Sequence, residues 1–178
     1  MNAPFMGRFK VTQTQHSAHD GFDMVPYDDK NVYSTVSGTV VYAGWQNASV
    51  QYGKNAGFGQ YVCIKSDADG LYYYFAHLSK ISVSYGAKVK ITDKIGVVGH
   101  TGYCIPEGEG GTHLHYCARK QFAVGNAADI SAISGIPNAV GDYDDGYRPG
   151  PEVPKQEEKK KIKVTIEIDD HIYSGLLE

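Results

Sequence analysis

Short runs of β-branched and aromatic residues, bounded by Gly, Asn or Asp, recur along this chain. Such runs predict strands, because these side chains pack well on a pleated, half-buried surface. The runs are 36–44, 59–64, 71–77, 87–91, 95–99 and 113–117. No segment before residue 118 has a sustained helical period of apolar positions. The pattern therefore predicts an all-β fold for residues 19–118.

The connection at residues 67–70 indicates how the strands are arranged. Asp67-Ala68-Asp69-Gly70 is short enough to be a hairpin loop, and Gly70 is free to adopt a positive φ. A hairpin joins neighbouring strands that run in opposite directions. We therefore expect an antiparallel sheet.

The pattern changes after Lys120. Residues 126–133 are compatible with a short helix, 135–150 read as loop, and 151–161 are rich in Pro and charged residues, as is typical of a linker. Beyond them Ile162, Val164, Ile166 and Ile168 alternate with polar residues and predict a β-hairpin. We expect three parts, at 1–125, 126–161 and 162–178. Because an isolated hairpin is marginally stable, the last part is expected to dock or self-associate.

Composition narrows the function. Among the 178 residues no apolar run is long enough to cross a bilayer, and the net charge of −3 with scattered Lys and Arg argues against nucleic acid as a partner. Cys63, Cys104 and Cys117 have neither zinc-finger nor redox spacing. The first fifteen residues do not resemble a signal peptide. We expect synthesis in the cytoplasm with reduced thiols; the alternative is secretion with a leader already removed.

Two segments carry candidate metal ligands. On a strand, His113 and His115 lie on one face about 7 Å apart. His19 and Asp23 add an imidazole and a carboxylate. They can reach the same ion if the chain bends between them, and Gly21 permits such a bend. Two imidazoles, one carboxylate and an open position are typical of a catalytic zinc site.

Other residues compete for these roles. His16 and Asp20 have the same spacing as His19 and Asp23, but Ala18 lies between them instead of glycine. Cys117 lies on the same strand face as His113 and His115. It could be a third ligand or a small buried apolar residue. A histidine at a strand end, such as His77, is more often structural than catalytic. His100 and His171 are expected to face solvent.

Several sequence blocks together resemble the lysostaphin-type zinc endopeptidases, which cut peptidoglycan. They occur in family order over about 100 residues and are His19-x-Gly21-x-Asp23, Gly38-Thr39-Val40, Gly57-Phe58-Gly59-Gln60-Tyr61-Val62, Tyr74-Phe75-Ala76-His77-Leu78-Ser79, Ile95-Gly96-Val97-Val98-Gly99-x-Thr101-Gly102 and His113-Leu114-His115-Tyr116.

The resemblance implies a fold, a cofactor and roles. The fold is an antiparallel sheet with an open substrate groove. His19, Asp23 and His115 would ligate one Zn²⁺ per chain, and His77 and His113 would flank it as catalytic imidazoles. Zinc would lower the pKa of a water toward ~7 and polarise the peptide carbonyl. No His-Glu-x-x-His motif supplies a glutamate base, so proton transfer would fall to the two flanking histidines.

The chain departs from the family pattern in three places. The loop 103–111 is longer and more acidic than usual, position 117 is Cys where the family commonly has an acidic residue, and the stretch before His19 is short and matches poorly. None of these departures removes a proposed ligand or catalytic imidazole. The expected partner is a peptidoglycan peptide, either stem or cross-bridge; the sequence does not identify the bond.

Other classes fit less well. A cupin-like barrel needs a Glu three or four residues after His-x-His, where Arg119 stands, and an iron(II) oxygenase needs His-x-Asp or His-x-Glu. A metal-free binding or activator module of the same fold is the alternative to an enzyme. The organisation resembles a phage or prophage lysin acting on the cell wall, with a secreted autolysin as the other possibility.

Overall fold

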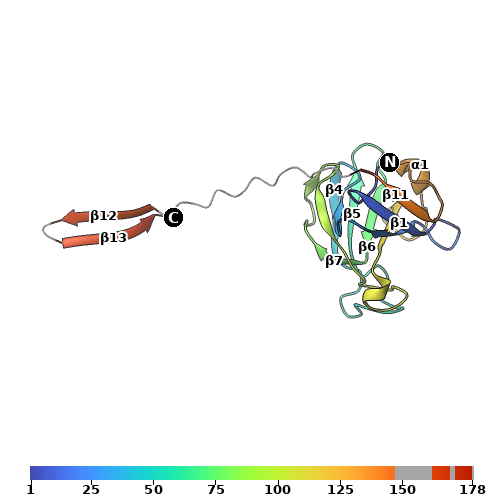
Figure 1. Ribbon diagram of the computed structural model, residues 1–178, viewed down its shortest axis with the longest axis horizontal. Coiled ribbons are helices and arrows are strands. Elements are labelled where there is room, and N and C mark those ends of the chain that lie inside the picture. The colour runs from blue at the N-terminus through green and yellow to red at the C-terminus, as the bar shows by residue number, and fades with distance from the viewer. Residues whose placement is uncertain (147–161, 169–170, 178) are drawn as a thin grey trace.

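The computed structural model describes residues 1–146, 162–168 and 171–177, and it is nearly all-β (Figure 1). The strands before residue 120 are β1 (Arg8–Gln13), β2 (Phe22–Pro26), β3 (Asn31–Tyr33), β4 (Gly38–Trp45), β5 (Gln60–Ser66), β6 (Tyr72–Ala76), β7 (Leu78–Ile81), β8 (Lys88–Val89), β9 (Lys94–Val98) and β10 (Leu114–Arg119). A 3₁₀ helix (Glu109–Gly111) precedes β10, and helix α1 (Ile130–Ser134) and strand β11 (Gly141–Asp144) follow it.

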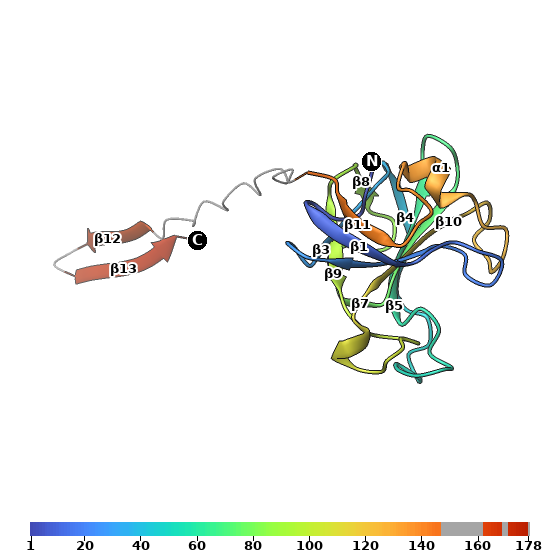
Figure 2. The same ribbon diagram turned by 45° about the vertical axis from the view of Figure 1, so that its right-hand side comes forward.

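The strands form a large sheet and a small one. The eight-stranded sheet has the order β11-β1-β2-β10-β6-β5-β4-β8, and β3, β9 and β7 form the three-stranded sheet (Figures 1 and 2). The neighbouring strands pair antiparallel, and β5 and β6 are joined through Gly70 at φ 70°. The predicted all-β, antiparallel fold is therefore confirmed.

The main core lies between the two sheets because alternate strand positions point inward. In β10, Leu114, Tyr116 and Ala118 belong to this core together with residues of the small sheet such as Ile95 and Leu78. The other face of the large sheet carries a smaller aromatic and thiol cluster, consisting of Tyr61, Cys63, Tyr74, Ala76 and Cys117. Period-two alternation therefore sends β10 residues of odd number to this second face.

The segment after residue 125 is more ordered than the sequence suggested. The short helix begins at Ile130, later than expected, because Asp129 caps it by accepting a hydrogen bond from the Ala132 amide. The expectation that 135–150 is loop was wrong in part, since β11 pairs with β1. Ile130 and Ile136 are fully buried in the main core. The packed core thus continues past residue 125, where we placed the end of the first part.

The two ends of the chain add further strands. Pattern analysis missed β1 and β2, although Phe9, Val11, Phe22 and Met24 are fully buried there. At the other end β12 (Ile162–Ile168) and β13 (His171–Leu177) pair antiparallel as the predicted hairpin. The proposed linker, 151–161, lies outside the described residues, as do residues 147–150. Within the described ranges, no helix is long and apolar enough to cross a membrane.

Candidate metal centre

Two adjacent strands and one tight turn place the candidate ligands. Asp23 of β2 lies directly opposite His115 of β10 in the sheet register. Both side chains point away from the main core because their neighbours Phe22 and Leu114 point into it. His19 is brought back toward Asp23 by a turn in which the His16 and His19 backbones exchange hydrogen bonds of 2.9 and 3.0 Å.

Gly21 is required for a different reason from the one expected. Its φ is not in the left-handed region; the backbone instead passes so close to β10 that a Cβ would lie 2.3 Å from the Tyr116 carbonyl oxygen and 2.6 Å from the Cys117 Cβ. A side chain there would push the segment carrying His19 and Asp23 off the strand carrying His115. The glycine thus permits close approach rather than a bend.

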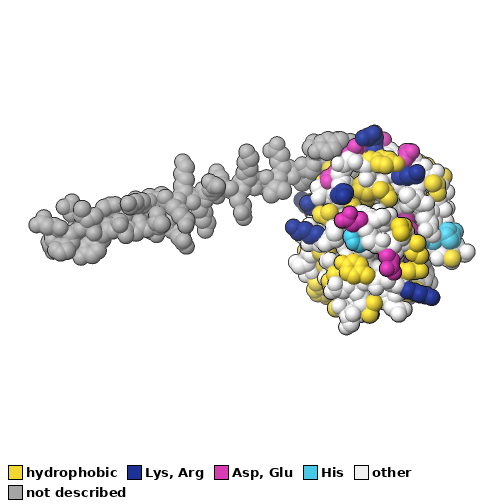
Figure 3. All heavy atoms as spheres, turned by 60° about the horizontal axis from the view of Figure 1, so that its bottom comes forward, with side chains coloured by type: hydrophobic (Ala, Val, Ile, Leu, Met, Phe, Trp, Pro, Cys, Tyr) yellow, Lys and Arg dark blue, Asp and Glu magenta, His cyan; other side chains and the backbone are white. Residues whose placement is uncertain are grey.

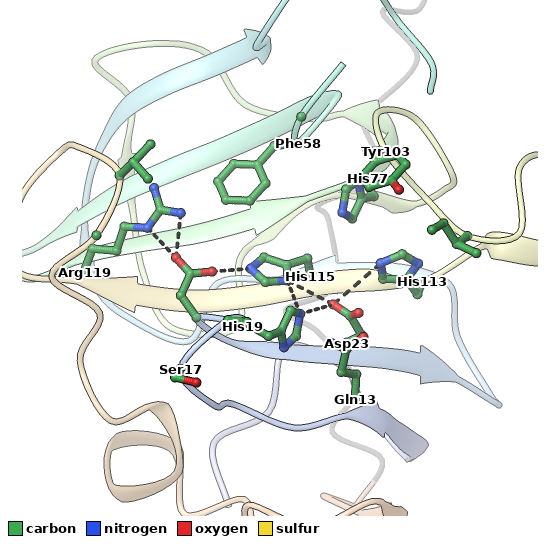
Figure 4. Close-up of a pocket in the computed structure, with 16 residues that line it drawn as sticks. Gln13, Ser17, His19, Asp23, Phe58, His77, Tyr103, His113, His115 and Arg119 are labelled. Atoms are coloured by element: carbon green, nitrogen blue, oxygen red, sulfur yellow. Dashed lines mark hydrogen bonds and ion pairs between the residues drawn. The ribbon is translucent and has the colours of Figure 1, made fainter. Parts of the chain in front are cut away.

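The three predicted ligands converge on one point (Figure 4). His115 Nδ1 lies 3.1 Å from His19 Nε2 and 2.9 Å from Asp23 Oδ1, and the latter two atoms are 3.1 Å apart. These residues form one of the groups able to hold a metal ion among the described residues. Two nitrogens and one carboxylate oxygen are a donor set that zinc accepts.

The outer hydrogen bonds of the two imidazoles decide which nitrogens are free. His19 Nδ1 is 2.9 Å from the Thr14 carbonyl oxygen, which can only accept, so Nδ1 carries the proton. His115 Nε2 is 3.1 Å from Asp20 Oδ1, so in the neutral ring Nε2 donates and Nδ1 is left unprotonated. Three lone pairs then face one another, an arrangement that is repulsive until a cation occupies the point between them.

The pKa shifts of the group also indicate that it favours a positive charge at its centre. Burial of His115 disfavours its charged form, but hydrogen bonds to Asp20 and Asp23 outweigh it and hold the pKa well above the usual value. For Asp23, burial raises the pKa, yet hydrogen bonds to His115 and His19 dominate and lower it far below the usual range. The centre therefore favours additional positive charge, which a proton or a metal ion can supply.

His77 and His113 lie beside this group, with ring centroids 4.7 Å apart. A backbone carbonyl fixes each ring: His77 Nδ1 is 2.8 Å from Thr101 O, and His113 Nδ1 is 2.7 Å from Gly111 O. The proton therefore sits on Nδ1 in both rings and Nε2 is free. His113 Nε2 lies 3.6 Å from Asp23 Oδ1.

The two flanking histidines differ in their surroundings. His77 is 5% exposed and adopts a left-handed φ of 62°, a conformation that non-glycine residues rarely take and that clusters at functional sites. Burial, together with the nearby His113 and His115, lowers the pKa of His77 to about 3, so its ring stays neutral. An unperturbed histidine has a pKa of about 6.5, so the fold makes this ring much less basic than the proton-transfer role expected for it requires.

All five residues line a surface cavity of about 620 Å³ (Figure 4). Tyr103 and Ile105 form part of its wall, and Val124 and Gly125 another part. Ile105 and Val124 are 73% and 87% exposed, so the wall presents apolar side chains to solvent. The predicted open groove corresponds to this cavity.

The alternative ligand pair is not assembled. His16 is exposed, and its Nδ1 accepts a hydrogen bond from the Ala18 amide. Asp20 instead bonds His115 and Arg119. His100 is partly buried, with its ring 6.1 Å from that of Tyr52, so the expectation that it faces solvent was wrong in part. The side chain of His171 lies outside the described residues.

Sequence reasoning missed the role of Asp20 and Arg119. Arg119 Nε and Nη2 lie 2.7 and 2.6 Å from Asp20 Oδ2. For Asp20, burial raises the pKa, but His115 and Arg119 outweigh it and the pKa falls well below the usual value. The available signal was strand parity, since Arg119 shares the face of His115. Fully buried Cys117 lies on the same face, grouped with Asp20 and His115.

Comparison with solved structures places the fold. The catalytic domain of the antimicrobial peptidase lysostaphin from Staphylococcus simulans is 26% identical, with a TM-score of 0.54 over 71% of this chain and 89% of that chain. A catalytic-domain mutant of the prophage-encoded M23 protein EnpA from Enterococcus faecalis has a TM-score of 0.53 over 72% and 94%; at 24% identity it supports the fold alone.

Sequence comparison gives the family. An uncharacterized metalloprotease of Buchnera aphidicola subsp. Baizongia pistaciae is 34% identical over 109 residues, which are 61% of this chain but only 25% of that protein. The chain thus spans about a quarter of that relative's length. The profile of peptidase family M23 matches residues 17–129, a stretch that contains all five site residues. The chain belongs to peptidase family M23.

Proposed function

We propose that this protein is a zinc-dependent endopeptidase that hydrolyses peptide bonds of bacterial peptidoglycan. The observation that carries the proposal is the convergence of three ligand atoms, from His19, Asp23 and His115, on one point beside a cavity. Membership of a peptidase family and similarity to lysostaphin support the reaction class and the substrate.

His19, Asp23 and His115 would hold the ion through Nε2, a carboxylate oxygen and Nδ1. When bound, zinc supplies Lewis-acid polarisation of a carbonyl and lowers the pKa of a water toward ~7. The protein's own contribution is to hold the three atoms close together and aimed at one point. The Thr14 carbonyl and Asp20 do this by engaging the opposite nitrogen of each ring.

His113 is the residue best placed to move protons. Its Nδ1 is occupied by Gly111, while Nε2 faces Asp23 and the cavity. It can therefore accept a proton from the attacking water at Nε2 and return it to the leaving amine. His77, buried and neutral, offers Nε2 as a hydrogen-bond acceptor that orients water or a substrate N–H. We thus assign proton transfer chiefly to His113 and not equally to both.

The surface is consistent with a peptide as substrate. On the face shown in Figure 3, basic and acidic side chains are interspersed, with no continuous basic stripe of the kind that nucleic acids require. The apolar wall residues Ile105 and Val124 offer contacts to a peptide lying in the cavity.

The test begins with the metal content of the purified protein, where we expect one zinc per chain. Chelation should abolish hydrolysis of purified cell walls, and added Zn²⁺ should restore it. His115→Ala and Asp23→Ala should lose both metal and activity, because each removes one of only three protein ligands. Mass analysis of peptides released from walls of several cross-link types would identify the bond.

The matched control is His16→Ala, which removes an imidazole from the same turn but outside the centre and should change neither metal content nor activity. A folded wild-type protein without stoichiometric zinc would support the alternative, a metal-free binding or activator module. Full zinc occupancy in Asp23→Ala would show that the carboxylate ligand had been misassigned.

A further inference from the structure

We propose that Asp20 and Arg119 are a positioning pair for the metal ligand His115, and that Asp20 supplies the carboxylate that the thiol of Cys117, on the same strand face, cannot supply. The proposal rests on the proposed function, because it assumes that His115 binds the metal through Nδ1. Neither residue would touch metal or substrate. Their effect would be on the orientation of the imidazole and on which of its two nitrogens faces the metal.

Each oxygen of the Asp20 carboxylate has its own partner. Oδ1 lies 3.1 Å from His115 Nε2, and Oδ2 lies 2.7 Å from Arg119 Nε and 2.6 Å from Arg119 Nη2. The His115 and Arg119 side chains are only 5% and 8% exposed, so water has little access to the two donors, although Asp20 itself is 27% exposed. With both oxygens engaged, Asp20 is held at the outer nitrogen of His115, on the opposite side of the ring from His19 and Asp23.

Arg119 is itself fixed by three further contacts. Its guanidinium carbon lies 5.1 Å from the Phe58 ring centroid and 4.6 Å from that of Tyr74, and Nη1 donates a 3.2 Å hydrogen bond to the Ala123 carbonyl. The Phe58 ring in turn stacks on His115, at 5.3 Å between centroids and 28° between planes. The contacts form a closed ring from His115 through Asp20, Arg119 and Phe58 back to His115, which restricts rotation of the imidazole.

The thiol at position 117 explains why the carboxylate comes from another segment. Cys117 lies between His115 and Arg119 on the same face of β10, and ligating atoms of Asp20, His115 and Cys117 lie within 4.8 Å of one another. A carboxylate at 117 would therefore start from a position close to both His115 and Asp20. A thiol is a weak acceptor and cannot form an equivalent charge-assisted bond.

Gly21 makes the substitute possible. Because the chain at Gly21 passes against Tyr116 and Cys117, the neighbouring Asp20 comes within reach of β10. The segment 19–23 then delivers two ligands and the group that orients the third. A second metal at Asp20, His115 and Cys117 is disfavoured, since Arg119 already places a full positive charge 2.6 Å from the carboxylate.

The decisive measurement is zinc affinity of the full-length protein, by competition with a chromophoric chelator. Removing a residue that hydrogen-bonds a metal ligand typically lowers metal affinity by about 10- to 100-fold, and we expect a loss of this size for Asp20→Ala. Asp20→Asn should lose less, closer to about 10-fold, because its amide oxygen still accepts a hydrogen bond from Nε2. Stoichiometry should remain one zinc per chain, and the visible spectrum of the Co²⁺ form should change in both variants.

The control is Asp28→Ala, which breaks another Asp–Arg pair, the 2.7 Å bridge of Asp28 to Arg8, away from the cavity. It should leave zinc affinity unchanged. Cys117→Glu introduced into Asp20→Ala should recover most of the lost affinity, because the new carboxylate reaches His115 from its own strand. This rescue distinguishes a positioning role from general destabilisation. If Asp20→Ala lowered zinc affinity only by destabilising the fold, adding Cys117→Glu would not restore the affinity.

Three results would overturn the inference while leaving the proposed function intact. They are wild-type zinc affinity in folded Asp20→Ala and Asp20→Asn, a folded double variant that recovers no affinity, and a second zinc equivalent in the wild type that disappears with Asp20. Failure of the proposed function would look different, since the wild type itself would then bind no zinc.

Discussion

Strand β10 has two faces, both buried but for different reasons. Toward the main core it presents Leu114, Tyr116 and Ala118, each 0% exposed. Toward the cavity it presents His115, Cys117 and Arg119, which are 4%, 0% and 6% exposed. One face gains free energy by removing apolar surface from water. The other buries polar groups, which costs free energy unless each one has a partner.

The difference shows how this fold separates stability from chemistry. On the core face the main requirement is volume and shape, and the Tyr116 hydroxyl, 2.8 Å from Thr35 Oγ1, is the one side-chain polar group that β10 places there. On the cavity face each polar atom needs a particular partner: Asp23 and His19 at one nitrogen of His115, Asp20 at the other. Substitutions on the two faces should therefore fail in different assays.

The largest effect should come from the cavity side, with His113→Ala. We expect it to keep its zinc but to lose about 10²- to 10⁴-fold in turnover, the usual cost of removing a general acid or base. His77→Ala should lose less, because His77 acts here as a neutral acceptor. Turnover on a wall-derived peptide and zinc content of the same samples test this. If the His113→Ala protein contained no zinc, His113 would be the metal ligand and the roles assigned to His113 and His115 would have to be exchanged.

On the core face, Leu114→Ala should show the opposite profile. Removing a fully buried leucine leaves a cavity and destabilises the fold by about 2–5 kcal/mol, while zinc stoichiometry stays at one per chain. Denaturant unfolding of the zinc-bound protein measures the loss. Lys65→Ala, at an exposed position in β5, should stay within about 0.5 kcal/mol of wild type. A Leu114→Ala protein that is stable but metal-free would mean that the faces are coupled.

The same contrast explains what the sequence could and could not reveal. Runs of β-branched and aromatic residues bounded by turn residues are a local signal, so β5, β6 and β10 were predictable. Strand β11, Gly-Asp-Tyr-Asp, has little strand propensity of its own and forms because β1 offers it an edge. Short motifs located the five central residues. The role of Asp20 depends on contacts with residues 95 and 99 positions away, which no local pattern encodes.

A smaller effect should appear when pH is varied without metal. His115 and His19 have folded-state pKa values raised above 6.5, through Asp20 and Asp23 for His115 and mainly through Asp23 for His19. The stabilisation from protonating them is complete below pH 6.5 and is lost as pH rises through the folded pKa. The metal-free protein should therefore unfold a few degrees lower at pH 9 than at pH 6.

Zinc affinity should change in the opposite direction over this range, because binding requires unprotonated imidazoles and displaces their protons. Thermal unfolding with and without metal, at several pH values, gives both slopes. His115→Ala should flatten the slope of the metal-free protein. If the metal-free protein became more stable from pH 6 to pH 9, protonation of His115 and His19 would not be stabilising it, and the prediction would be wrong.

The smallest effect on the centre should follow from removing the C-terminal hairpin. A chain ending at Gly150 retains β11, Ile130 and Ile136, so it should fold, bind one zinc and cut soluble wall fragments as the full chain does. A chain ending at residue 125 is the matched control and should be strongly destabilised, because it loses those fully buried isoleucines and the partner of β1.

The hairpin's alternating apolar positions predict self-association or docking, so light scattering should show a lower mass, or thermal unfolding a lower stability, for the chain ending at Gly150. Unchanged mass and stability together with lost binding to intact walls would instead identify the hairpin as a wall-binding element, whereas loss of zinc would show that it supports the centre directly.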